Sequence, residues 1–88
     1  MKPVVFHRTF DKHYIKRIKP IPKLVKQFEE RCTLFLAGKR GYPLDDHPLT
    51  KKLAGKRAFS IAGDIRVIYV ETEDEIIFLD VGTHNQVY

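Results

Sequence analysis

The sequence has a single cysteine and lacks the patterns that mark a metal centre, a nucleotide-binding loop or a membrane span. Cys32 can form no internal disulfide bond, which is typical of a reducing cytoplasm, and its apolar neighbours predict a buried structural thiol. No Cys/His cluster has zinc spacing, and no Gly-rich phosphate loop or nucleophile elbow occurs. No apolar run approaches about 18 residues, and the N-terminal apolar stretch is too short for a signal peptide. We therefore expect a cytoplasmic protein with no membrane segment, no metal and no small-molecule cofactor.

The composition is that of a small, basic, folded domain. The 88 residues are 43% hydrophobic and 31% charged, and 16 Lys and Arg against 11 Asp and Glu give a net charge of +5. A chain of this length predicts one domain over residues 1–88 with a modest core, which argues against a deep cofactor cavity. A small basic domain favours polyanions, so nucleic acid or the ribosome is the expected partner.

Hydrophobic periodicity predicts the element order β-α-α-β-β-β. A strand is expected over residues 3–10, a helix over 12–18 with Asp11 as its N-cap, and a longer helix from Pro22 to Gly38. After a loop over 38–49, alternation predicts strands over 56–61, 65–70 and 75–81, with turns at 62–64 and 71–74 and a tail over 82–88. The fold class is α+β: two N-terminal helices packed on one face of a mainly antiparallel, four-stranded sheet.

Side chains suited to cutting RNA without a metal are concentrated in the second half of the chain. Such cleavage needs a base for the 2′-hydroxyl, an acid for the 5′-oxygen and cations for the phosphate. A meander of three strands brings strand ends and the tail close together, so these side chains could converge on one face. They are His47, Lys51, Lys52, Lys56, Arg57, Asp64, Arg66, His84 and Tyr88.

Most of these residues also have a structural interpretation. His47 before Pro48, and Asp64 after Gly63, suit turns, and His84 after a strand can cap the chain. The cations between residues 51 and 57 can form a solvated face, and the Tyr88 ring can anchor the chain end on the sheet edge. Arg66 lies in an apolar strand and needs an anionic partner wherever it is buried.

The first half of the chain offers two further histidines, His7 and His13. Neither has a visible chemical partner in the sequence, so both are expected to be non-catalytic.

Four ordered motifs resemble the RelE/ParE superfamily of bacterial and archaeal type II toxins, and the YafQ branch above all. The resemblance covers residues 46–88 by motif and the first 45 residues only by helical pattern. It implies a RelE-like fold and an mRNA interferase that cuts mRNA in the ribosomal A site and is neutralised by a cognate antitoxin protein. The motifs are Asp46-His47-Pro48-Leu49, Leu53-Ala54-Gly55-Lys56-Arg57, Gly63-Asp64-Ile65-Arg66-Val67-Ile68-Tyr69 and Gly82-Thr83-His84-Asn85-Gln86-Val87-Tyr88.

The resemblance also implies roles for individual residues. His47, Asp64, His84 and Tyr88 match the catalytic pattern of YafQ-like toxins, and Arg66 matches a strand arginine of RelE-like toxins. Two positions depart from the YafQ pattern. Ser60 replaces a second histidine and Ile65 replaces a tryptophan. We group Ser60 with Lys51, Lys52, Lys56 and Arg57 as expected RNA-binding residues.

Two other functions remain open on the same fold. One is a ParE-type toxin that inhibits gyrase by binding, against which His47, His84 and Tyr88 argue together. The other is a catalytically inactive relic that only binds an antitoxin, which the departures at Ser60 and Ile65 keep open.

Overall fold

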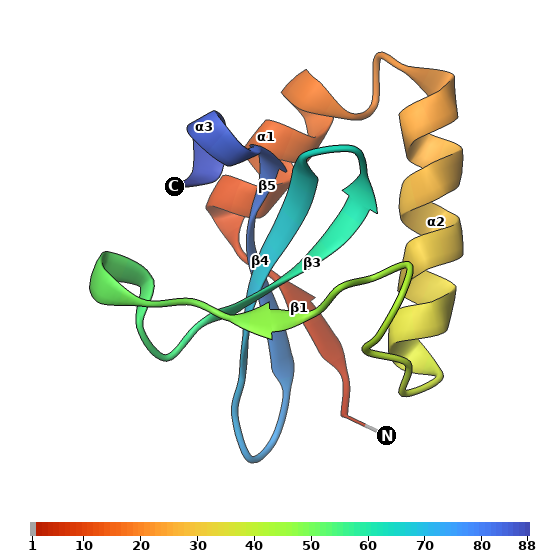
Figure 1. Cartoon of the computed structure of the whole chain (residues 1–88). Coiled ribbons are helices and arrows are strands. Elements are labelled where there is room, and N and C mark those ends of the chain that lie inside the picture. Colours follow the sequence, from red (N-terminus) through yellow and green to blue (C-terminus); the bar gives the residue numbers. More distant parts are fainter. Residues whose placement is uncertain (1) are drawn as a thin grey trace.

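The computed structural model describes residues 2–88 and shows five strands in one sheet with helices on both sides (Figure 1). In chain order the elements are β1 (Val4–Phe6), α1 (Arg8–Arg17), α2 (Pro22–Leu36), β2 (His47–Pro48), the 3-10 turn η1 (Lys51–Leu53), β3 (Arg57–Ala62), β4 (Ile65–Glu71), β5 (Ile76–Thr83) and α3 (His84–Val87).

The sheet order is β1-β5-β4-β3-β2, with β1 parallel to β5 and every other pairing antiparallel. The predicted α+β class and mainly antiparallel sheet are confirmed. The predicted count of four strands is wrong, because β2 adds an edge strand inside the segment that was expected to be a loop.

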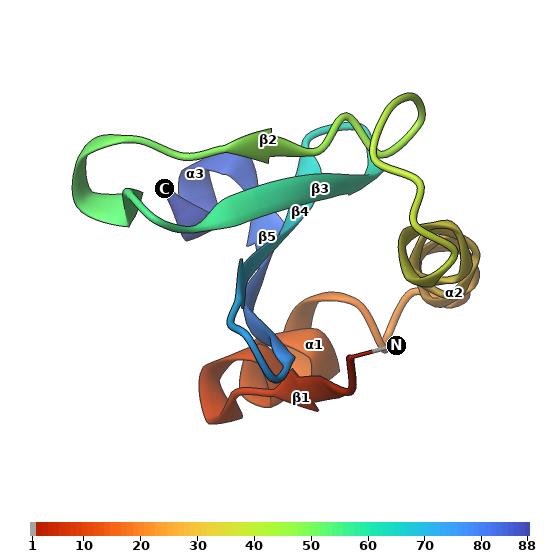
Figure 2. The same ribbon diagram turned by 90° about the horizontal axis from the view of Figure 1, so that it is seen from below.

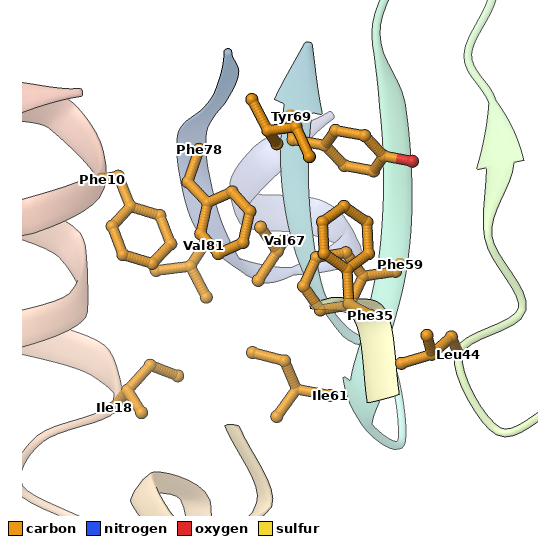
Figure 3. Close-up of a cluster of buried hydrophobic side chains, with 11 residues drawn as sticks. Phe10, Ile18, Phe35, Leu44, Phe59, Ile61, Val67, Tyr69, Phe78 and Val81 are labelled. Carbon is orange, nitrogen blue, oxygen red and sulfur yellow. The ribbon is translucent and has the colours of Figure 1, made fainter. Parts of the chain in front are cut away.

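A single aromatic core joins both long helices to one face of the sheet (Figure 3). Phe35 of α2 stacks on Phe59 of β3 with ring centroids 4.7 Å apart, and Phe10 of α1 lies 5.5 Å from Phe78 of β5. In both ribbon views α2 and α3 lie on opposite sides of the sheet (Figures 1 and 2). The core therefore occupies one face, and the other face is left for α3 and the segment around η1.

The N-terminal elements differ from the prediction. The strand ends at Phe6 and α1 begins at Arg8, because the His7 ring nitrogen Nδ1 accepts a hydrogen bond from the Thr9 amide at 3.1 Å and caps the helix. Asp11 is inside the helix, so its assignment as N-cap is wrong. The alternating Val4 and Phe6 resembled the start of a longer strand, whereas Phe10 is buried at helical spacing.

The C-terminal tail is also more ordered than predicted. Strand β5 continues through Thr83, and α3 follows without a break.

Cys32 is half-buried against the core rather than fully buried, and burial raises the pKa of its thiol to about 12. Within residues 2–88 no helix is long and apolar enough to cross a membrane.

A fully buried carboxylate, Asp46, joins the chain before β2 to the sheet. It accepts hydrogen bonds from Arg57 Nε at 2.7 Å and from the Tyr69 hydroxyl at 2.5 Å. The Arg40 guanidinium lies 4.0 Å from the same carboxylate. Burial, and then the hydrogen bond to Asp46, raise the pKa of Tyr69 to about 12. A buried charge is stable only when paired in this way.

We predict that Tyr69→Phe destabilises the fold by about 1.5–3 kcal/mol at neutral pH, since a hydrogen bond to a buried charge is lost. The folded pKa of Tyr69 exceeds its ordinary value of 10.0, so this stabilisation is complete below pH 10 and is lost as pH rises through about 12. Urea unfolding of both proteins at pH 8 and at several values above pH 10 measures the difference. Comparison with the variant cancels the effects of high pH that the two proteins share, the titration of Cys32 among them. A difference that stays constant or grows with pH would contradict the prediction.

Candidate active site

A cleft opens between the segment around η1 and the C-terminal helix α3. It has a volume of about 570 Å³ and is lined by Leu49, Thr50, Lys51, Lys52, Leu53, His84 and Tyr88. Four of these residues, Lys51, Lys52, His84 and Tyr88, were predicted from the sequence as catalytic or RNA-binding. The cleft thus brings two cations, an imidazole and a phenol to one apolar-walled hollow.

The first wall is a short excursion of the chain between β2 and β3. The Leu49 amide donates to the Lys56 carbonyl at 2.9 Å and closes the base of the excursion. Gly55 has φ +89°, a left-handed conformation that glycine adopts without strain, and it turns the chain back into β3. Lys51 and Lys52 are therefore carried by η1 at the rim of the cleft, with Leu49 and Leu53 beside them.

The second wall is α3 with Tyr88 directly after it, and one helical turn brings His84 and Tyr88 to the same side. Their rings meet edge to face with centroids 4.4 Å apart, and the Tyr88 amide donates to the His84 carbonyl at 3.0 Å. Burial raises the pKa of the Tyr88 hydroxyl, and the charge of Arg66 partly opposes that rise. At neutral pH the hydroxyl is consequently protonated and able to donate a hydrogen bond.

His47, Ser60 and Arg66 lie on the sheet. In antiparallel pairs, directly opposed residues share a face. His47 is opposite Ala58, which is opposite Ile68, and Ser60 is opposite Arg66. His47 is also two residues before Leu49, so alternation along the chain directs it to the side of the sheet on which the cleft lies.

The His47 ring is exposed and has a defined hydrogen-bond partner. Its Nδ1 lies 2.9 Å from the Asp45 carbonyl oxygen. A carbonyl only accepts, so in the neutral ring Nδ1 carries the hydrogen and Nε2 is left as a proton acceptor. In this tautomer Nε2 is the nitrogen that can act as a general base.

Other predicted residues do not line the cleft. Asp64 is exposed in the turn between β3 and β4, and the Arg66 guanidinium donates to the Gly63 carbonyl at 3.1 Å. Ser60 is buried, and its amide donates to the Leu44 carbonyl at 2.7 Å. Lys56 is half-buried beside the excursion.

Arg57 is opposite Tyr69 on the core face, and the hydrogen bond to Asp46 raises the pKa of its guanidinium. Its cation is therefore already paired with a carboxylate inside the fold.

Sequence reasoning missed two kinds of residue. Asp46 was treated as part of a turn, although an acid next to a histidine in an apolar context could have indicated a buried partner for Arg57. Leu53 was given no role of its own, although it lines the cleft. Among residues 2–88, no cluster of three or more His, Cys, Asp and Glu residues could hold a metal ion.

Comparison with known proteins gives a family and a set of solved structures. A family model described as the bacterial toxin of type II toxin–antitoxin system, YafQ, matches residues 2–88. No curated protein matches the sequence.

Several solved structures share the fold. Escherichia coli YafQ superposes with a TM-score of 0.82 at 22% identity, covering 100% of this chain and 99% of that chain. A copper-bound mutant toxin from Helicobacter pylori gives 0.84 at 22% identity and covers 100% of both chains. A chain of the E. coli DinJ–YafQ complex gives 0.80 at 23% identity, covering 100% of this chain and 99% of that chain.

We predict that Arg66→Gln raises the pKa of Tyr88 further, because the positive charge that favours the phenolate is removed. NMR titration of the Tyr88 ring resonances above pH 9 measures the change. Arg8→Gln on the exposed start of α1 is the control and should leave the Tyr88 titration unchanged. An unchanged or lowered pKa in Arg66→Gln would show that Arg66 does not act on this end of the cleft.

Proposed function

The chain belongs to the YafQ family of type II toxin–antitoxin toxins, and we propose that it is an endoribonuclease that cleaves mRNA on the ribosome by acid–base catalysis. The observation that carries this proposal is the cleft that joins His84 and Tyr88 to Lys51 and Lys52. In this proposal the reaction uses side chains alone, and a cognate antitoxin binds the protein and neutralises it. The DinJ–YafQ complex supports an antitoxin as the partner.

The proposed chemistry is a transfer within the RNA backbone. A base removes the proton of a 2′-hydroxyl, the 2′-oxygen attacks the adjacent phosphorus, and the 5′-oxygen leaves with a proton from an acid. The products are a 2′,3′-cyclic phosphate and a 5′-hydroxyl end. Imidazole is the side chain that can serve as either acid or base near neutral pH, so His47 and His84 are the proposed pair.

The remaining residues of the site bind and orient the RNA in this proposal. Lys51 and Lys52 neutralise the phosphate on which charge accumulates. Tyr88 offers a half-exposed ring on which a base can stack, and Arg66 supplies a nearby positive charge. Lys56 is kept as an RNA contact beside the cleft and Asp64 as an orienting group in its turn, while Ser60, which is buried, is given no contact with RNA. We assign Arg57 to the ion pair with Asp46 rather than to the RNA.

We predict that the purified protein cleaves mRNA on programmed ribosomes in the presence and absence of added metal chelator, provided the ribosomes stay intact. His84→Ala and His47→Ala should each lower the cleavage rate by roughly 10²-fold or more while remaining folded, the usual loss for a general acid or base. Primer extension and 5′-end analysis of the cleaved mRNA measure the rate and the end chemistry.

The matched control for these variants is His7→Asn, which changes a histidine outside the cleft and keeps an N-cap for α1. Both variants cleaving like the wild-type protein would return His47 and His84 to structural roles. Replication arrest before translation arrest on expression would favour the gyrase-inhibiting alternative. No arrest, with antitoxin binding intact, would favour the inactive relic.

Two variants of Tyr88 distinguish a ring that stacks on a base from a hydroxyl that takes part in proton transfer. If its ring stacks on a base, Tyr88→Ala should weaken RNA engagement by about 1–3 kcal/mol while Tyr88→Phe changes it little. If the hydroxyl takes part in the reaction, Tyr88→Phe alone should slow cleavage at unchanged affinity. Binding and single-turnover cleavage measured side by side resolve the two. Tyr42→Ala, which removes a 91% exposed ring outside the cleft, is the control. Normal cleavage and binding by both Tyr88 variants would make the residue a packing anchor.

A further inference from the structure

Helix α3, which begins at His84 and is followed directly by Tyr88, is too short to hold itself in place. It spans only four residues, His84–Val87, and forming a first helical turn is unfavourable in isolation. The chain before it, residues 81–83, must therefore be fixed by contacts with the rest of the fold. Pairing with β4 places the backbone of these residues in the sheet, and side chains of α1 and α3 add further contacts at the junction.

From α1, the Arg17 guanidinium reaches the end of β5. Its terminal nitrogen Nη1 donates to the Val81 carbonyl at 2.9 Å and lies 3.7 Å from an Asp80 carboxylate oxygen. The same carboxylate oxygen lies 2.6 Å from His13 Nδ1 and accepts from the Val81 amide at 2.7 Å. Arg17 and Asp80 are both about four-fifths buried at their side chains, with exposed fractions of 20% and 22%. Side chains of α1 thus contact the end of β5 at the Val81 carbonyl and at the Asp80 carboxylate, which also accepts from the Val81 amide.

From α3, the Gln86 side chain folds back over the junction. Its carboxamide oxygen accepts from the Thr83 amide at 2.8 Å, which is one half of a capping box. Without this bond the Thr83 amide would lose its partner at the start of the helix. Gln86 therefore sets the point at which the strand ends and the helix begins.

Gly82 allows both contacts to occur at the same place. A Cβ atom added there would lie 2.7 Å from Arg17 Nη1 and 2.7 Å from the Gln86 carboxamide oxygen. These two atoms are the free ends of long side chains and could swing away, whereas the Gln86 Cβ, 3.1 Å from the added atom, is fixed to the backbone of α3 and could move only with it. A methyl group at residue 82 would then displace the two groups that fix the junction while leaving the core intact.

We propose that Arg17 and Gln86 are positioning residues, which act through the glycine between them to orient α3 and so hold His84 and Tyr88 in the cleft. The inference rests on the proposed function only for its effect on catalysis. Its structural part, the orientation of the two rings, is independent of what the cleft does.

The experiment compares four variants of the full chain by NMR. Gln86→Ala and Gly82→Ala should lose the nuclear Overhauser contacts between the His84 and Tyr88 rings. Gln86→Glu keeps an acceptor oxygen for the Thr83 amide and should retain them. Asn85→Ala, in the same helix and exposed, is the control and should also retain them. The melting temperature identifies any variant that fails to fold. If Gly82→Ala fails to fold, the comparison of Gln86→Ala with Gln86→Glu decides the result.

Cleavage assays on the same variants give the catalytic readout. Gln86→Ala and Gly82→Ala should lower kcat by roughly 10–100-fold with a smaller change in KM, since small misplacements of reacting groups have effects of this size. Ring contacts that persist in Gln86→Ala, or that fail to return in Gln86→Glu, would overturn the proposal. If the wild-type protein cleaves no RNA but the ring contacts follow the expected pattern, the positioning roles stand and the proposed function fails.

Discussion

The fold depends on the placement of one buried charge, Asp46. Its carboxylate is fully enclosed and has Arg57, Tyr69 and Arg40 as partners. These partners come from β3, β4 and the loop after α2, so a single side chain fixes the segment that enters β2. Loss of one partner leaves the buried carboxylate with fewer compensating groups, and breaking a buried pair costs more than the net gain from making it. The position of His47, the next residue, is consequently set by packing rather than by the strength of a two-residue strand.

One face of the sheet forms the core and the other lies on the side of the cleft. Because side chains alternate along a strand, each residue belongs to one of these faces. Phe59, Val67 and Tyr69 face the helices and form the core, while Ala58 and Ser60 face the side on which α3 lies. Arg57 and Lys56 are neighbours in sequence, yet only Arg57 is drawn into the ion pair with Asp46. Successive residues of this basic segment point to opposite faces of the sheet, so one cation pairs inside the fold while its neighbour stays at the surface. Net charge alone does not show which cation is free to bind a phosphate.

Sequence patterns were sufficient to predict the elements in which a hydrophobic period extends over many residues. Helix α2, the three strands of the meander and the turn at Gly63 follow from apolar spacing and turn chemistry. Sequence patterns failed to predict short elements whose structure depends on contacts of only a few residues. Strand β2 has two residues and exists because β3 pairs with it, and the cap of α1 is a histidine, which propensity does not favour. The cleft could be expected from motifs, since His84 and Tyr88 lie in one of them. The apolar wall of the cleft, and the contacts of Arg17 and Gln86 at Gly82, become visible only in the three-dimensional structure.

The departure at Ser60 increases the dependence of the proposed chemistry on these supports. A serine hydroxyl does not exchange protons near neutral pH as an imidazole does, so the acid and base roles fall on His47 and His84 alone. Both residues are exposed and neither is on a long element, because β2 has two residues and α3 has four. Their positions therefore depend on two groups of contacts, Asp46 with its partners and Gly82 with Arg17 and Gln86. In such a site the residues that position the imidazoles matter as much as the imidazoles themselves, since a misplacement of about 1 Å can lower the rate by about 10²-fold. A sequence only 22% identical to a solved relative can thus keep the backbone of the fold, while its proposed reactivity is decided by side chains that motif comparison does not weigh.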